Sequence, residues 1–135
     1  MNERPILVAG LGCRRECSRD ELLALLDSTL AEQGSSTARL TALASSAHKA
    51  AEPGLQLLAA HLNLPIHFLP AEVLAGYHGR LTDTSAKALQ LTGTPGVAEA
   101  SALALAEQLS GRPARLWITK RKSAAATLAV ARVDG

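Results

Sequence analysis

The chain has 135 residues, a formal net charge of +2, 47% hydrophobic residues and only 2% aromatic residues. These values are typical of one globular domain over residues 1–135, and they exclude a disordered chain. The scarcity of aromatic side chains and the nearly balanced charge argue against a nucleic-acid-binding surface. Because no apolar run approaches the roughly 20 residues that span a bilayer, and the amino terminus lacks the form of a signal peptide, we expect a cytoplasmic protein without a membrane partner.

The first part of the chain predicts strands alternating with helices. An apolar run over 6–9 is typical of a buried strand, and the glycines at 10 and 12 predict a turn after it. Ser18 and Glu21 have the spacing of a capping box, which predicts a helix that Gly34 ends. The next expected elements are a strand over 39–44, a helix opening at Pro53-Gly54, a strand over 65–69 and a brief helical turn over 70–75.

The second part of the chain predicts an irregular loop, a helix and a hairpin. The loop covers 76–94 and the helix 97–109. Two strands over 114–119 and 124–133 are expected to be joined by a turn at Lys120–Ser123. This order predicts an α/β fold: a single three-layer α/β/α domain with a mostly parallel sheet of about five strands and a C-terminal β-hairpin.

Ligands of open α/β sheets bind where the parallel strands end. Here those ends are followed by residues 10–15, 45–49 and the chain after 69. The helix beginning near Gly96 is expected to open on the same side, where its N–H groups and dipole favour an anion. Arg14, Arg15 and Lys49 add positive charge there, so the predicted ligand is anionic.

Each of these features also has a purely structural interpretation. Gly10 and Gly12 equally fit a simple turn. A carboxylate such as Glu99 is favoured in a first helical turn by the dipole alone. The other structural alternatives are a solvated helix entry for Arg14 and Arg15, a surface ion pair for Lys49 and Glu52, and a solvated hairpin tip for Lys120–Lys122.

Standard cofactor and metal motifs do not fit the sequence. Arg15 stands where a dinucleotide fingerprint needs its third glycine, and no acid ends the second strand. Cys13, Cys17 and the four histidines lack the spacing of a zinc site, so we expect no metal and no cofactor. The two cysteines are expected to be free thiols. At a strand-to-helix turn beside Arg14, the pKa of Cys13 is expected to be lowered, although no histidine is placed to serve as its base.

Four groups of residues together resemble the CobE/CbiG C-terminal family of cobalamin (vitamin B12) biosynthesis, over about residues 5–133. They are Gly10-Leu11-Gly12-Cys13-Arg14-Arg15; Ala44-Ser45 with Lys49, Glu52, Gly54-Leu55 and Leu64-Pro65-Ile66; Ser85 with Gly93, Gly96-Val97-Ala98-Glu99 and Ala102; and Lys120 with Lys122 before the strand 127–131. The chain departs from the family at Leu81–Thr84, where a proline is expected, and at Ala100-Ser101.

The resemblance implies the standalone form of the family and a three-layer α/β/α domain. It implies that the partner is an anionic tetrapyrrole, a precorrin or corrinoid intermediate of the aerobic pathway, which the chain carries or presents to a ring-modifying step. Tyr77, Leu74 and Leu81 are expected to cover the apolar ring. The residues expected to bind the intermediate are Gly10, Gly12, Cys13, Arg14, Arg15, Ser45, Lys49, Glu52, Ser85, Gly96, Val97, Glu99 and Lys120.

Two alternatives remain open for the same family. The chain could be a hydrolase that opens a lactone or cleaves a C–C bond of a precorrin, with Glu52 or Glu99 as the base. It could instead be a non-enzymatic partner of other cobalamin-pathway enzymes, such as a methyltransferase, with Lys120–Lys122 as the docking surface.

Overall fold

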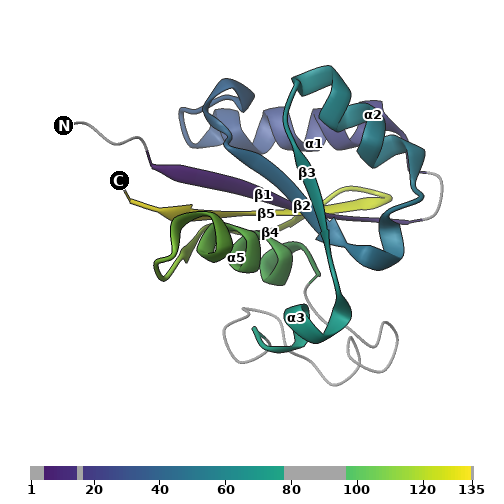
Figure 1. Cartoon of the computed structure of the whole chain (residues 1–135). Helices are drawn as coiled ribbons and strands as arrows, with labels where there is room; N and C mark the ends of the chain where they lie inside the picture. Colours follow the sequence, from purple (N-terminus) through teal and green to yellow (C-terminus); the bar gives the residue numbers. More distant parts are fainter. Residues whose placement is uncertain (1–4, 15–16, 78–96, 135) are drawn as a thin grey trace.

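The computed structural model describes residues 5–14, 17–77 and 97–134. Within these ranges the strands form one five-stranded sheet in the order β3-β2-β1-β5-β4 (Figure 1). The strands are β1 (Ile6–Cys13), β2 (Ala42–Ser46), β3 (Ile66–Leu69), β4 (Arg115–Lys122) and β5 (Ala126–Val133). The helices are α1 (Arg19–Glu32), α2 (Pro53–Leu62), α3 (Ala71–Ala75) and α5 (Val97–Ser110), with short 3-10 turns η1 (Thr37–Arg39) and η2 (Ala47–Lys49).

The sheet is mixed, so the prediction of a mostly parallel sheet is overstated: only two of its four strand pairs are parallel. The pairs β1–β2 and β2–β3 are parallel, whereas β1–β5 and β4–β5 are antiparallel. The reason is that the second strand of the hairpin lies against β1 inside the sheet, while β4 lies at the outside. Since β4 is antiparallel to β5, it runs in the same direction as β1, β2 and β3. We call the side where these four strands end the carboxyl end of the sheet, and the opposite side the amino end.

Helices cover both faces of the sheet, as the sequence predicts. In Figure 1, α1 and α2 lie on one face and α5 on the other, with α3 on the same side as α5. Alternate residues of β1 point to opposite faces: Leu7 and Leu11 pack with α1 and α2, whereas Val8 packs with α5. Each fully buried leucine contributes about 2 kcal/mol of transfer free energy to this arrangement. No helix in the described ranges combines the length and the apolar character needed to cross a bilayer.

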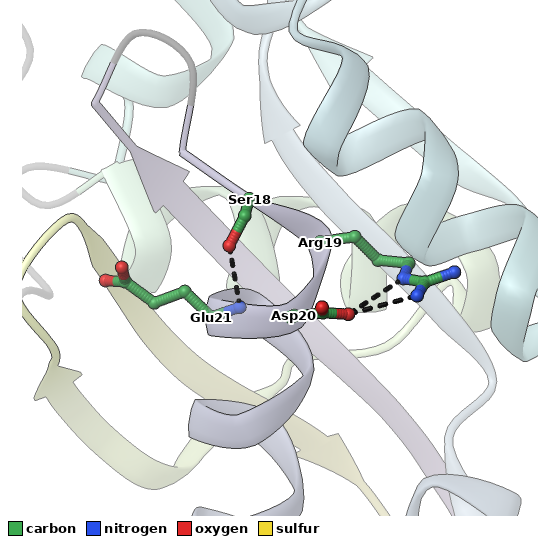
Figure 2. Close-up of polar contacts among 4 residues, drawn as sticks. All are labelled: Ser18, Arg19, Asp20 and Glu21. Carbon is green, nitrogen blue, oxygen red and sulfur yellow. Dashed lines mark hydrogen bonds and ion pairs between the residues drawn. The ribbon is translucent and has the colours of Figure 1, made fainter.

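Local signals account for the helix boundaries. The Ser18 hydroxyl accepts a hydrogen bond from the Glu21 N–H at 3.0 Å, which confirms the predicted cap of α1 (Figure 2). Gly34 has a φ of 69° just beyond the end of that helix. Pro53 lies in the first turn of α2, and α5 covers the helix expected over 97–109. Each of these boundaries depends on residues that are close in sequence.

The predicted glycine turn at 10 and 12 is wrong, because β1 continues through both glycines to Cys13. The whole strand pairs with β5, with Gly10 opposite Ala129 and Gly12 opposite Thr127. At Gly10, α5 lies so close that a Cβ would overlap the Ala98 carbonyl oxygen and lie 2.8 Å from the Ala102 nitrogen. Glycine is needed here for close packing of a helix on a strand rather than for a turn.

Two other boundaries differ from the prediction. The second strand begins at Ala42 rather than 39, since residues 37–39 form the turn η1. In the hairpin, Arg121 and Lys122 pair with Leu128 and Thr127, so Lys120–Lys122 belong to β4 and the turn is at 123–125. Pairing with a partner strand extends β4 beyond the residues whose own preference favours a strand. Most of the loop predicted over 76–94 lies outside the described residues.

Candidate site at the carboxyl end of the sheet

Several of the residues singled out in the sequence lie at the carboxyl end of the sheet. β1 ends at Cys13 with Arg14 directly after it, β2 is followed by η2 with Lys49, and β4 ends at Lys122. The register of β1 with β5 and of β4 with β5 aligns these ends. These segments therefore end on the same side of the sheet, whereas Arg15, Ser85 and Gly96 lie outside the described residues.

On the face covered by α5, a buried carboxylate joins α5 to β4. Glu99 lies in the first turn of α5 and is only 1% exposed. Its Oε2 accepts a hydrogen bond from the Lys120 backbone N–H at 2.9 Å. Two segments 21 residues apart in the sequence, both part of the family resemblance, are thus in direct contact. Val97 begins the same helix and is half-buried.

Gly10 and Gly12 of β1 point to that same face, Gly10 against α5 and Gly12 against a side chain of β5. A Cβ on Gly12 would lie 2.5 Å from the Thr127 Oγ1 of the neighbouring strand. Both glycines therefore have packing roles, in place of the turn that was their structural interpretation in the sequence. This does not place them against a ligand.

The opposite face carries the two cysteines and the polar end of β2. Cys13 and Cys17 are free and buried, and they pack with the core under α1 and α2. Ser45 is fully buried, and its hydroxyl donates a hydrogen bond to the Leu11 carbonyl oxygen at 2.6 Å. Ser45 therefore ties β2 to β1, and its hydroxyl points into the protein rather than outward.

The prediction of a lowered pKa for Cys13 is wrong. Burial raises the pKa of the Cys13 thiol; its hydrogen bond with Cys17 opposes this rise, while the Glu52 charge adds to it and Lys49 lowers it. Burial, the contact with Cys13 and the nearby carboxylates raise the pKa of Cys17 to about 12. The desolvation cost of a thiolate exceeds the help from positive charge, so neither cysteine is activated as a nucleophile.

Arg14 and Lys49 supply positive charge at this end of the sheet. Among the described residues, neither the Arg14 guanidinium nor the Lys49 ammonium forms a hydrogen bond or ion pair. Arg14 is exposed and Lys49 is half-buried. The backbone of Arg14 is fixed, because its N–H donates to the Ala125 carbonyl at 2.8 Å. Lys49 and the half-buried Glu52 both act on the Cys13 thiol, which places them around the end of β1.

Glu21 also belongs to this end of the sheet, although its place in the sequence predicts only a local role. In a complete capping box, the Glu21 carboxylate would accept a hydrogen bond from the Ser18 N–H. Instead the side chain extends away from the Arg19–Asp20 pair, as Figure 2 shows. Its Oε2 accepts hydrogen bonds from the Ser123 hydroxyl at 2.5 Å and the Ala125 N–H at 2.6 Å. The only signal in the sequence was a glutamate in a first helical turn, which local rules explain without a distant partner.

Leu74 and Tyr77, two of the three residues predicted to cover the apolar ring of the ligand, both contact other parts of the protein. Leu74 is 1% exposed and belongs to the core under α5. The Tyr77 hydroxyl donates to the Glu107 carboxylate at 2.8 Å. Glu107 is two turns of α5 beyond Glu99, about 12 Å along the helix, toward the amino end of the sheet. Leu81 lies outside the described residues.

The part of the chain that the structure describes holds no cluster of metal ligands. No three histidine, cysteine, aspartate or glutamate side chains among its residues gather as potential ligands of one ion. The chemistry that this end offers within those residues is therefore that of fixed positive charge, hydrogen-bonded carboxylates and buried neutral thiols.

Comparison with known proteins connects this fold to one family. Residues 7–131 match the family described as "Cobalamin synthesis G C-terminus". The chain is 38% identical over 125 residues to Protein CobE of a Sinorhizobium species, a match that covers 93% of this chain and 79% of that protein.

Solved structures give the same result. The crystal structure of CobE, a protein from the cobalamin (vitamin B12) biosynthetic pathway, superposes with a TM-score of 0.91 at 50% identity, covering 98% of this chain and 94% of the other. Cobalamin biosynthesis protein chiG from Agrobacterium tumefaciens str. C58 gives 0.70 at 31% identity, covering 93% and 97%. A putative cobalamin biosynthesis protein G homolog from Sulfolobus solfataricus gives 0.71 at 23% identity; it shares the fold, and this chain covers 36% of it.

Proposed function

The chain is a cobalamin-biosynthesis protein of the CbiG C-terminal family, and from this premise we propose that it binds a precorrin or corrinoid acid at the carboxyl end of its sheet. Such molecules carry several acetate and propionate arms around a large ring. A protein that holds them needs cations along one side. The observation that carries the proposal is that Arg14, Lys49 and Lys120 lie at this one end: Arg14 follows β1, Lys49 lies in η2 after β2, and Lys120 lies near the end of β4.

The side-chain chemistry of Arg14 and Lys49 supports binding of carboxylates. An arginine can grip a carboxylate through two parallel hydrogen bonds, while a lysine contributes a mobile point charge. Because Arg14 and Lys49 have no ion pair among the described residues, a ligand carboxylate would not have to displace one there. The ligand would therefore gain charge-assisted contacts without the cost of breaking existing ones.

The position of Glu99 favours binding over hydrolysis by that residue. A general base must reach the water or proton it acts on. The Glu99 side chain is buried, and one of its oxygens already accepts the Lys120 N–H. Of the two carboxylates considered for a hydrolase, Glu52 is the more accessible, and it is half-buried.

A titration with hydrogenobyrinic acid, followed by its visible spectrum and by retention of pigment on the purified protein, tests the proposal. The wild-type protein is expected to shift the spectrum at micromolar concentration. The double variant R14A/K49A is expected to lose about 100-fold in affinity, since two charge-assisted contacts are removed. The matched control is R112A/R115A, which removes two arginines that contact Asp134 at the other end. It is expected to bind like the wild type.

Two results would contradict the proposal. One is no spectral change and no retained pigment with the wild-type protein. The other is an equal loss in both double variants, which would show that the carboxyl end has no special role. In parallel reactions with a lactone-containing precorrin, release of acetaldehyde that disappears in E52Q would favour the hydrolase instead.

A further inference from the structure

The turn of the β4–β5 hairpin is attached to the first turn of α1 by one side chain. Glu21 is the third residue of α1, yet its carboxylate reaches a turn 104 residues later in the chain. One oxygen, Oε2, accepts from both the Ser123 hydroxyl and the Ala125 N–H. Hydrogen bonds to an ionised carboxylate are stronger than those between neutral groups. The contact therefore fixes the hairpin turn relative to α1.

The same hairpin is held from the other face of the sheet. There, Glu99 of α5 accepts the Lys120 N–H at 2.9 Å. Between the two helices, the Arg14 N–H donates to the Ala125 carbonyl oxygen at 2.8 Å. Two carboxylates, each from the first turn of a helix on a different face, thus hold the backbone of the hairpin where its basic residues are.

The orientation of the Glu21 carboxylate decides how its negative charge affects ligand binding. A carboxylate near an anion-binding site would ordinarily weaken binding through repulsion. Here the carboxylate faces hydrogen-bond donors of the hairpin, and these bonds, with the nearby Arg14 guanidinium, lower the pKa of Glu21. Simple repulsion therefore predicts that removing this side chain raises the affinity for an anionic ligand, whereas a positioning role predicts that it lowers the affinity.

Building on the proposed function, we propose that Glu21 is a positioning residue for carboxylate binding at the carboxyl end of the sheet. It ties the hairpin turn at 123–125 to α1, and through Ala125 it also sets the place of Arg14. Arg14 and the end of β4 can then present their charges to one ligand without rearranging first. Preorganisation of this kind raises affinity because less order has to be imposed during binding.

The variant E21A tests this role against the matched control D20A. Asp20 belongs to the same helical turn, carries the same charge, is exposed, and pairs with Arg19 on the other side of the helix (Figure 2). Both variants lose one carboxylate from the favourable end of α1, and E21A also loses two hydrogen bonds to the hairpin, so a small loss in thermal stability is expected from D20A and a larger one from E21A. Only E21A is expected to lower the affinity for hydrogenobyrinic acid, by about 10-fold.

Hydrogen exchange provides a measurement that does not depend on the ligand. In E21A the Ala125 amide is expected to exchange about 10-fold faster, while amides in the centre of β1 keep their protection. In D20A both rates stay unchanged. E21Q keeps an oxygen that can accept the Ala125 N–H, so its exchange rate and affinity are expected to lie between those of wild type and E21A. This variant also serves if E21A does not fold.

The outcomes separate the two proposals. If E21A and E21Q bind the corrinoid as well as the wild type, or more tightly, repulsion outweighs positioning and the role of Glu21 is overturned, while the proposed function stands. The role is also overturned if D20A loses as much affinity as E21A. If the wild-type protein does not bind at all, the proposed function fails and the inference fails with it.

Discussion

At the amino end of the sheet, arginines face a carboxylate; at the carboxyl end, carboxylates face backbone amides. Asp134 accepts from Arg132 at 2.6 Å and lies 3.6 Å from Arg115, while Arg112 donates to its backbone oxygen at 2.7 Å. At the carboxyl end, Glu21 and Glu99 accept from the hairpin. The first end uses its cations to hold its own chain, whereas the second leaves Arg14 and Lys49 without such partners among the described residues.

Helix α5 connects the two ends, with a carboxylate near each of its termini. Glu99 accepts the N–H of Lys120, near the end of β4, and Glu107 accepts the N–H of Ala114, just before β4 begins. Both bonds hold α5 alongside β4, with the helix and the strand running in opposite directions. What distinguishes the ends is therefore the surrounding charge rather than the way in which the helix is attached.

The largest effect on stability is expected from adding a side chain at Gly10, where α5 lies directly against β1. In G10A the new methyl group would overlap the Ala98 carbonyl oxygen, which belongs to the helix backbone and cannot rotate away. We expect a loss of about 3 kcal/mol in the free energy of unfolding, measured by urea denaturation. The control is G76A, where the nearest atom would lie 3.4 Å away and the backbone φ is −64°. A change in G10A no larger than that in G76A would show that α5 is not pressed against β1.

Removal of the two carboxylates of α5 sharpens the comparison between the ends. E99A leaves the Lys120 N–H without its acceptor in a buried place, so we expect a loss of about 2 kcal/mol in stability. E107A removes the acceptor of Ala114 and Tyr77 at a half-buried position, with an expected loss of about 1 kcal/mol. Denaturation measures both, and titration with hydrogenobyrinic acid should detect a change only in E99A. A loss of affinity in E107A would mean that the ends are not functionally distinct.

The thiols at the carboxyl end should react slowly despite the positive charge around them. Because burial raises the pKa of both cysteines, native protein at pH 8 is expected to react with iodoacetamide at least about 10-fold more slowly than protein unfolded in urea. Labelling followed by mass spectrometry measures the two rates. Rapid labelling of Cys13 in the native protein would restore the idea of an activated thiolate.

The raised pKa of Cys17 predicts how the stability of the protein changes at alkaline pH. The ordinary pKa of a cysteine is 9.0, whereas Cys17 has a pKa of about 12 in the folded protein. Above pH 9 the unfolded chain loses its thiol protons first, so the folded state loses stability as the pH rises from 9 toward 12. C17A should reduce the steepness of this loss in denaturation curves. An identical slope in C17A and wild type would contradict the raised pKa.

The smallest effect on stability is expected from changing Asp134, at the amino end of the sheet. Hydrogen bonding to Arg132, together with its charge, lowers the pKa of Asp134 below its ordinary 3.8. Its contribution to stability is therefore present above pH 3.8 and is lost as the pH falls through the lower folded value. D134N should lower the denaturation midpoint slightly at neutral pH, and about 0.5 M salt should remove most of that difference by screening. A large, salt-independent loss of stability in D134N would contradict the interpretation of these contacts as weak surface ion pairs.

Patterns within a few residues determined much of the fold. Ser18, Pro53 and Gly34 mark helix boundaries because a cap or a stop acts on the nearest turn of the same helix. The alternation of apolar runs and helical stripes determined the α/β class and the hairpin. The basic residues after β1 and β2 could also be assigned to one end, since parallel strands end together.

Contacts between distant segments decided the rest. Whether Gly10 makes a turn or lies within a strand depended on β5 and α5, and no feature of residues 6–13 specifies either neighbour. The partner of Glu21 lies 104 residues away, so local capping rules could not identify it. The pKa of Cys13 depended on its burial, which outweighs the neighbouring charge that the sequence displays. Sequence patterns report what a residue prefers next to its neighbours, whereas strand order, close approach and desolvation arise only when the layers pack together.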